Sequence, residues 1–120
     1  MDQIINSKVY DLEGRTFEFA NNCKKFIKTL PRTISNIEYC KQLVRSSSSV
    51  GANYIEANES LSKKDFIMRV KICRKEAKES TYWLRLVECD DLMIETNKLL
   101  IQESIELTKI FGSILEKDKA

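Results

Sequence analysis

Basic side chains on one predicted helix are the residues of this sequence best suited to chemistry. Between Lys63 and Lys78 the chain carries seven basic and two acidic residues, a local excess of seven minus two, or five positive charges. At about 100° per residue, the lysines at positions 64, 71, 75 and 78 share a narrow arc. Such a row can bind a phosphate backbone nonspecifically, and an ordinary solvated helix face is the alternative. The candidate nucleic-acid contacts are Lys64, Lys71, Arg74, Lys75 and Lys78.

A second row of polar side chains lies on the preceding predicted helix, opposite its apolar face. Its members are Gln42, Arg45, Ser49, Asn53 and Glu56. Their spacing predicts either a solvated face or an intramolecular hydrogen-bond network. On the helix that follows, Glu76 and Glu79 are expected to pair with Lys or Arg across turns of the same helix.

The residue types needed for common catalytic and metal sites are missing. The sequence has no histidine, no glycine-rich phosphate loop and no Glu-x-x-His pair for a di-iron site. Its four cysteines, Cys23, Cys40, Cys73 and Cys89, are far apart and form no C-x-x-C pair. We therefore expect no enzyme activity, no metal and no cofactor, and we interpret the cysteines as reduced core residues.

Aromatic residues could add base stacking to a basic row, but we find none interleaved with these lysines. Sequence-specific readout of nucleic acid is therefore not expected. Tyr82 is predicted to pack at the end of the bundle. Trp83 could either pack there or anchor a partner, and the sequence leaves this open.

Length and composition predict one helical domain. The chain has 120 residues, one proline, three glycines and a net charge of +2, so attraction to nucleic acid must be local. No apolar run reaches the roughly 18 residues that span a bilayer, and we expect a cytoplasmic protein without membrane contact.

Apolar residues recur at intervals of three and four, which is typical of amphipathic helices. Pro31 ends the first helix, Ser35 or Asn36 is expected to cap the second, and Ser62 with Asp65 forms a capping box for the third. The second helix has small residues at its centre, and Ser47 and Gly51 are expected to let helices approach closely. Short connections favour an antiparallel up-down-up-down four-helix bundle. The predicted helices cover about 11–30, 36–59, 63–88 and 95–116.

The fourth predicted helix has more apolar residues than one core can cover. We place Ile101, Ile105, Thr108, Phe111 and Leu115 inward, which leaves further rows of apolar side chains. A helix that is apolar nearly all round is normally covered on more than one side, whereas single exposed apolar residues are ordinary. We interpret these rows as a subunit interface. The candidate interface residues are Phe17, Leu100, Leu107, Ile110 and Ile114.

Four segments of the sequence resemble a known family when taken in order. They are D-L-E-G-R-T-F-E-F-A at 11–20, S-V-G-A-N-Y-I-E-A at 49–57, S-K-K-D-F at 62–66 and K-E-A-K-E-S-T-Y-W-L at 75–84. Together they are similar to the bacterial four-helix-bundle proteins encoded within intervening sequences of large-subunit ribosomal RNA genes. That family is similar in fold to accessory proteins of diversity-generating retroelements.

The resemblance implies a ring-shaped homopentamer with a basic surface proposed to contact nucleic acid. This sequence departs from the family in two ways. Ile55 stands where a basic residue is common, and the net charge is small. Because the resemblance includes the polar row, a subunit contact or ligand site is an alternative for Arg45, Ser49, Asn53 and Glu56. We predict a homo-oligomeric, non-enzymatic scaffold or interaction module, for which the resemblance implies a pentamer. The alternative is an accessory protein that binds RNA or DNA through the basic row.

Overall fold

Four long α-helices make up nearly all of the part of the chain that the structure describes. This computed structural model describes residues 11–119, and side chains as far as residue 117. The helices are α2 (Leu12–Ile27), α3 (Ile34–Asn58), α4 (Lys63–Leu86) and α5 (Ile94–Lys119), with a 3-10 turn, η1 (Asp91–Met93), before α5. No strand occurs within 11–119. The predicted all-α class is confirmed.

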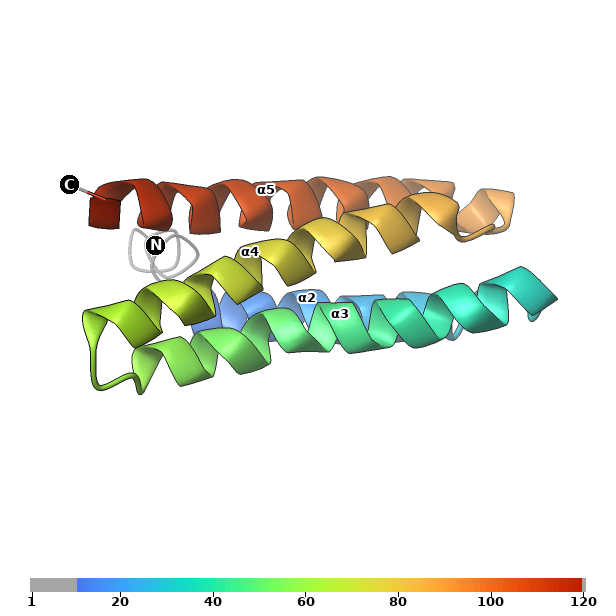
Figure 1. The fold of residues 1–120 in the computed structure, drawn as a ribbon. Helices are drawn as coiled ribbons and strands as arrows, with labels where there is room; N and C mark the ends of the chain where they lie inside the picture. The colour runs from blue at the N-terminus through green and yellow to red at the C-terminus, as the bar shows by residue number, and fades with distance from the viewer. Residues whose placement is uncertain (1–10, 120) are drawn as a thin grey trace.

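The four helices pack side by side. In Figure 1, α5 is uppermost, α3 lies below with α2 behind it, and α4 runs obliquely from beside the end of α3 up to α5. Helix α3 packs along α4, α4 packs along α5, and α2 contacts α3 and, less extensively, α5. Helix α4 therefore lies between α3 and α5, with one side left for solvent.

Side-chain caps begin the first three helices. Asp11 accepts from the backbone N–H of Gly14, and Ser62 accepts from that of Asp65, as the capping-box motif predicts. The cap of α3 was predicted wrongly. Thr33, not Ser35 or Asn36, accepts from a backbone N–H of the first turn, at 3.1 Å.

The buried Asn36 side chain instead forms hydrogen bonds with both the α2–α3 connection and the segment that follows α4. Its Nδ2 donates to the carbonyls of Pro31 and Glu88 at 2.9 and 2.8 Å, and its Oδ1 accepts from the N–H of Glu88 at 2.9 Å. The side chain is 1% exposed. Because buried amides need such partners, this residue fixes the end of α4 against the α2–α3 connection.

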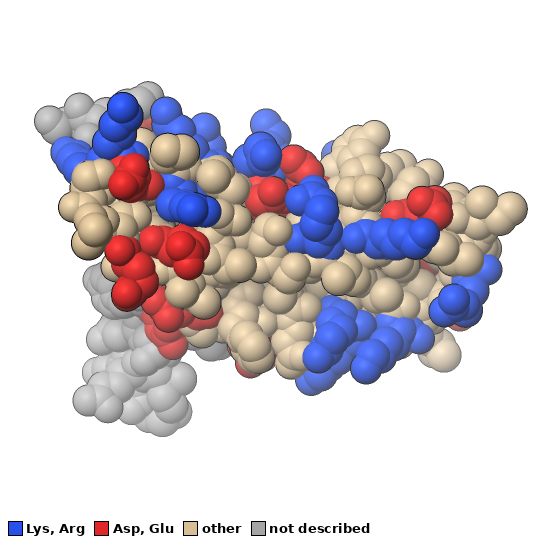
Figure 2. All heavy atoms as spheres, turned by 60° about the horizontal axis from the view of Figure 1, so that its bottom comes forward, with Lys and Arg blue, Asp and Glu red and all other residues tan. Residues whose placement is uncertain are grey.

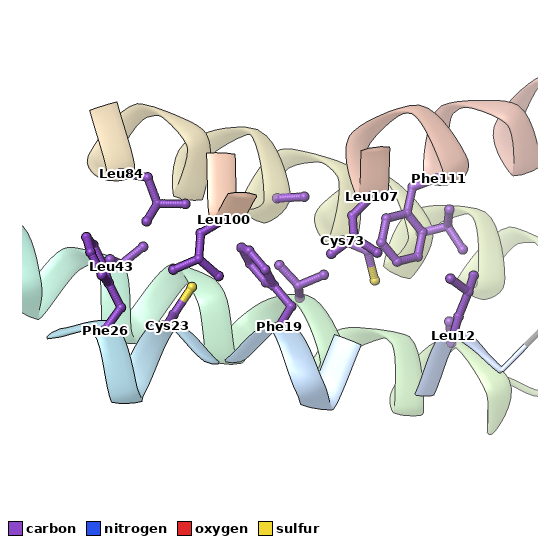
Figure 3. Close-up of a cluster of buried hydrophobic side chains, with 14 of the residues drawn as sticks. Leu12, Phe19, Cys23, Phe26, Leu43, Cys73, Leu84, Leu100, Leu107 and Phe111 are labelled. Atoms are coloured by element: carbon purple, nitrogen blue, oxygen red, sulfur yellow. The ribbon is translucent and has the colours of Figure 1, made fainter. Parts of the chain in front are cut away.

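The core runs the length of the bundle and draws on every helix. Figure 3 shows Phe19, Cys23 and Phe26 of α2 pointing toward Leu43, Cys73 and Leu100 of the other helices. Burial raises the pKa of the Cys23 and Cys73 thiols to about 12, so both stay neutral at ordinary pH. These two cysteines are core residues.

The inward faces of α3 and α5 differ from the predicted ones. In α5, Leu100 and Leu107 are 6% and 0% exposed, so they belong to the intramolecular core. The prediction that these two residues lie in a subunit interface is wrong. In α3, the apolar periodicity would turn Val44 and Ile55 inward, but they are about half exposed, at 48% and 49%. Helices α3 and α5 each pack against two neighbours, so both contacts together decide which face is buried.

Small residues at the centre of α3 let it approach α2 closely. Ser46, Ser47, Val50 and Gly51 are all buried. A Cβ atom added at Gly51 would lie 2.9 Å from Thr16 Oγ1 and 3.2 Å from Thr16 Cβ. Thr16 Oγ1 is held by the carbonyls of Leu12 and Glu13 at 2.6 and 3.1 Å, so it cannot easily turn away. The close approach therefore requires glycine at position 51.

Replacing Gly51 with alanine tests this contact. Alanine gains up to about 1 kcal/mol of helix propensity, but we expect overpacking against Thr16 to exceed that gain and give a net loss of about 1 kcal/mol. Gly112→Ala is the matched control, because the nearest atom to its added Cβ is Arg74 Cδ at 4.0 Å. Urea unfolding should show the control to be as stable as the parent chain or more so. Equal stabilities of the two variants would contradict the proposed close packing.

Candidate functional site

The basic row of α4 consists of Lys64, Lys71, Lys75 and Lys78, and it faces solvent. All four side chains are exposed, and none forms an ion pair with another residue of 11–117. The buried residues Val70, Cys73, Ala77 and Leu84 hold the opposite face of α4 in the core. Arg74 is also exposed, and its side-chain stem runs beside Gly112 of α5. The structure thus keeps the predicted nucleic-acid contacts available.

Positive charge on this protein is local. Figure 2 shows one face of the molecule, on which Lys and Arg side chains form separate groups with acidic side chains between them. This agrees with a net charge of only +2. A contact with phosphate would therefore depend on particular side chains and on close range.

A hollow between α4 and α5 continues the basic row. Lys75, Lys78, Tyr82 and Arg85 of α4 line it, together with Ile105 and Thr108 of α5. Tyr82 follows Lys78 by four residues and Lys75 by seven, so all three share one helix face. The Tyr82 side chain is 60% exposed, which corrects its predicted packing at the end of the bundle, and it lies directly beyond the lysines, not between them. The spacing of residues 75, 78 and 82 in the sequence could have predicted that Tyr82 shares a helix face with Lys75 and Lys78.

Trp83 packs inward where Tyr82 points outward. Its ring lies against the core and against Tyr39, with centroids 6.1 Å apart. Tyr82 meets the Trp83 ring edge-to-face at 5.0 Å. Trp83 Nε1 is buried without a hydrogen-bond partner among the described residues. Trp83 therefore supports the position of Tyr82.

Arg45 is bound within the chain by two carboxylates of α4. Its guanidinium donates to Glu76 at 3.4 and 3.5 Å and to Glu79 at 3.1 Å. The Glu76 side chain is only 7% exposed, whereas that of Arg45 is 51% exposed. Glu76 and Glu79 therefore pair across helices, not across turns of α4 as predicted. Beside them, the Ser46 and Ser80 hydroxyls lie 2.9 Å apart in the buried interface.

Of the other members of the polar row, some form hydrogen bonds within the chain and others face solvent. Asn53 Nδ2 donates to the Ser49 carbonyl at 2.9 Å, and Asn53 Oδ1 accepts from Arg69 at 2.9 Å. Ser49 is half-buried and Glu56 is exposed. Arg45 and Asn53 thus hold α3 to α4, which is the arrangement of the intramolecular alternative.

The outer face of α2 carries the most exposed of the candidate interface residues. Phe17 is 66% exposed and borders two hollows, one toward Leu99 of α5 and one toward Val44 of α3. Leu99 is also 66% exposed. Ile110 and Ile114 are half-buried and pack against the core. Of the residues predicted for an interface, Phe17 is the one that the structure leaves mainly in solvent.

An ion-pair cluster joins α2 to α5 beside this face. Arg15 donates to Glu103 at 2.7 and 2.8 Å and to Glu106 at 3.1 Å. The hydrogen bond to Glu103 is the main cause of a raised Arg15 pKa, which burial partly opposes. The bidentate pair thus adds a directional polar link where α2 and α5 have a smaller contact. Sequence reasoning missed this cluster because its members are 88 and 91 positions apart.

Acidic, cysteine and histidine side chains do not gather into a metal site within the described part of the chain. Within residues 11–119, no helix is both long enough and apolar enough to cross a membrane.

The fold and this surface define an all-helical protein with a charged helix exposed on one side. The chain belongs to the family of 23S rRNA-intervening sequence proteins, whose model matches residues 8–113. It is similar to a solved protein of unknown function from the S23 ribosomal protein family of Bacteroides thetaiotaomicron VPI-5482. The two are 31% identical, the match covers 91% of this chain and 98% of that one, and the TM-score is 0.75. No curated protein matches the sequence.

Removing the positive charge of Arg45 should lower the free energy of unfolding, because the buried carboxylate of Glu76 then loses its counter-charge. Arg45→Met keeps much of the apolar stem but leaves a buried carboxylate without its cation, so we expect a loss of about 1–3 kcal/mol. In a Glu76→Gln background the same change should cost less, and urea unfolding of the four proteins measures that coupling. Lys41→Met is the control, because the Lys41–Glu38 pair is 67% exposed on both sides and should contribute little. Additive losses would show that Arg45 and Glu76 act independently.

Proposed function

We propose that this protein is a nucleic-acid-binding, non-enzymatic helical bundle that contacts phosphate backbone through the basic row of α4. The observation that carries the proposal is the placement of four exposed lysines on one helix face, without ion-pair partners among the described residues. By contrast, Arg45 and Arg69, which lie nearby, are engaged inside the chain. The free lysines can exchange bound counterions for phosphates, which favours binding.

RNA is the first nucleic acid to test. The family is named for intervening sequences of 23S rRNA, and the solved relative is assigned to a ribosomal protein family, although that relative has no known function. These names supply a direction for the experiment. The contact itself is argued from the side chains of α4.

Charge reversal along the row tests the proposal. Lys71, Lys75 and Lys78 changed together to Glu should abolish RNA binding and leave helicity unchanged, because all three side chains face solvent. The matched control reverses Lys25, Lys28 and Lys41, which are exposed, lie outside α4 and do not line the hollows around Phe17. Fluorescence anisotropy over a range of salt concentrations should show affinity falling with salt for the parent chain and for the control. Unchanged RNA binding by the α4 variant would remove the basic row from consideration.

A second proposal concerns self-association, for which the outer face of α2 is the favoured surface. We propose an antiparallel up-down-up-down bundle that forms a homo-oligomer, with five subunits as the family resemblance implies. Phe17 supports this, because a phenylalanine that is two-thirds exposed between two hollows costs free energy in water. Several copies of the basic row in one assembly would also strengthen binding to a single RNA.

The mass in solution tests the assembly. Light scattering after size exclusion should give a mass near five times the 14.0 kDa chain, and Phe17→Glu should reduce it toward that of one chain. Leu61→Glu is the control, because Leu61 is fully exposed in the α3–α4 connection, outside the α2 face. A monomeric parent chain, or a Phe17→Glu variant that keeps its full mass, would contradict this interface.

A further inference from the structure

We propose that the hollow around Tyr82 holds an unpaired base, so that the protein selects single-stranded over duplex nucleic acid. This inference rests on the proposed binding of phosphate by α4 and adds the class of nucleic acid that is bound. The hollow lies at the C-terminal end of the basic row, between α4 and α5. It brings together the two elements of a single-strand site, which are an aromatic platform and flanking cations.

The Tyr82 ring is available for stacking and is held in position. It is 60% exposed, so much of its surface has no protein partner. Its edge-to-face contact with Trp83 has an interplanar angle of 78° and a centroid distance of 5.0 Å, which restricts the ring. Trp83 in turn packs against Tyr39 and the core. An ordered platform loses less entropy when a base stacks on it.

Cations surround this platform on the helix. Lys78 lies one turn before Tyr82 and Lys75 two turns before, while Arg85 follows by three residues and lines the same hollow. Side chains three or four positions apart on a helix have Cβ atoms about 5–6 Å apart. A base on Tyr82 would therefore place its flanking phosphates within reach of Lys78 and Arg85.

The remaining wall of the hollow does not oppose this ligand. Its acidic member, Glu79, accepts from Arg45 Nη2 at 3.1 Å and shares that cation with Glu76, so its charge is partly compensated, and Lys75, Lys78 and Arg85 outnumber it in the hollow. The Thr81 hydroxyl lies 2.6 Å from Ser104 Oγ, and the Thr108 hydroxyl donates to the Ser104 carbonyl at 2.8 Å. Because these hydroxyls are engaged within the chain, we expect stacking without strong preference for one base.

Duplex nucleic acid lacks the feature that this site would use. Both faces of a base inside a duplex are already stacked, so Tyr82 could gain a base only by unstacking it. Duplex should still contact the lysines through its phosphates. Single-strand selectivity therefore depends on Tyr82, whereas the shared electrostatic part of binding depends on the basic row.

Titrations with one RNA sequence, as a single strand and as a duplex, test the inference. The parent chain should bind the single strand more tightly. Tyr82→Ala should weaken single-strand binding about tenfold and leave duplex binding unchanged, and Tyr82→Phe, which keeps the ring, should behave as the parent chain. Equal losses for both RNAs, or no loss for either, would overturn the Tyr82 site while the proposed function stands. If the proposed function itself is wrong, the variant with Lys71, Lys75 and Lys78 changed to Glu should bind both RNAs as the parent chain does.

A second measurement needs no variant. A single-stranded chain of abasic nucleotides offers phosphates without bases, so it should bind the parent chain about tenfold more weakly than an ordinary strand of equal length. The emission of Trp83, which is the one tryptophan of the sequence, should change with the ordinary strand and not with the abasic one. Equal affinities and equal emission changes for the two strands would contradict base stacking at Tyr82.

Discussion

The close approach of α2 and α3 at Gly51 and Thr16 is the contact on which the rest of the bundle depends. An added Cβ at position 51 would lie 2.9 Å from Thr16 Oγ1. Because the neighbouring residues of α3 are also small, its other side can meet α4 through the Ser46 and Ser80 hydroxyls. The low helix propensity of serine and glycine is thus offset by packing, which usually decides helical stability in proteins.

This packing determines which side of α4 remains in solvent. Polar contacts from α3, above all those of Arg45 with Glu76 and Glu79, fix α4 in one orientation, and α5 covers its other flank. Two of the acidic residues of α4 are consequently engaged with α3. The side chains left outward are mainly Lys and Arg, so a nearly neutral protein presents a locally basic helix.

The proposed functions use different surfaces and so do not compete. Self-association is assigned to the outer face of α2 around Phe17, and nucleic-acid binding to α4 from Lys64 to Arg85. Helix α2 has no extensive contact with α4. An assembly built through α2 could therefore keep every copy of the α4 surface available, and the effective concentration of phosphate-binding groups would rise.

The sequence by itself determined the all-α class, the approximate helix bounds, the cap at Ser62 and the outward basic row, because periodicity and capping are local properties. Only the tertiary structure decided which stripe of α5 is buried: Leu100 and Leu107 face the core although equally apolar rows lie beside them. The partners of Arg45, the hydrogen bonds of Asn36 and the exposure of Tyr82 also depend on how helices cross. Contacts between residues distant in sequence follow from helix rotation and register, which a one-dimensional pattern does not specify.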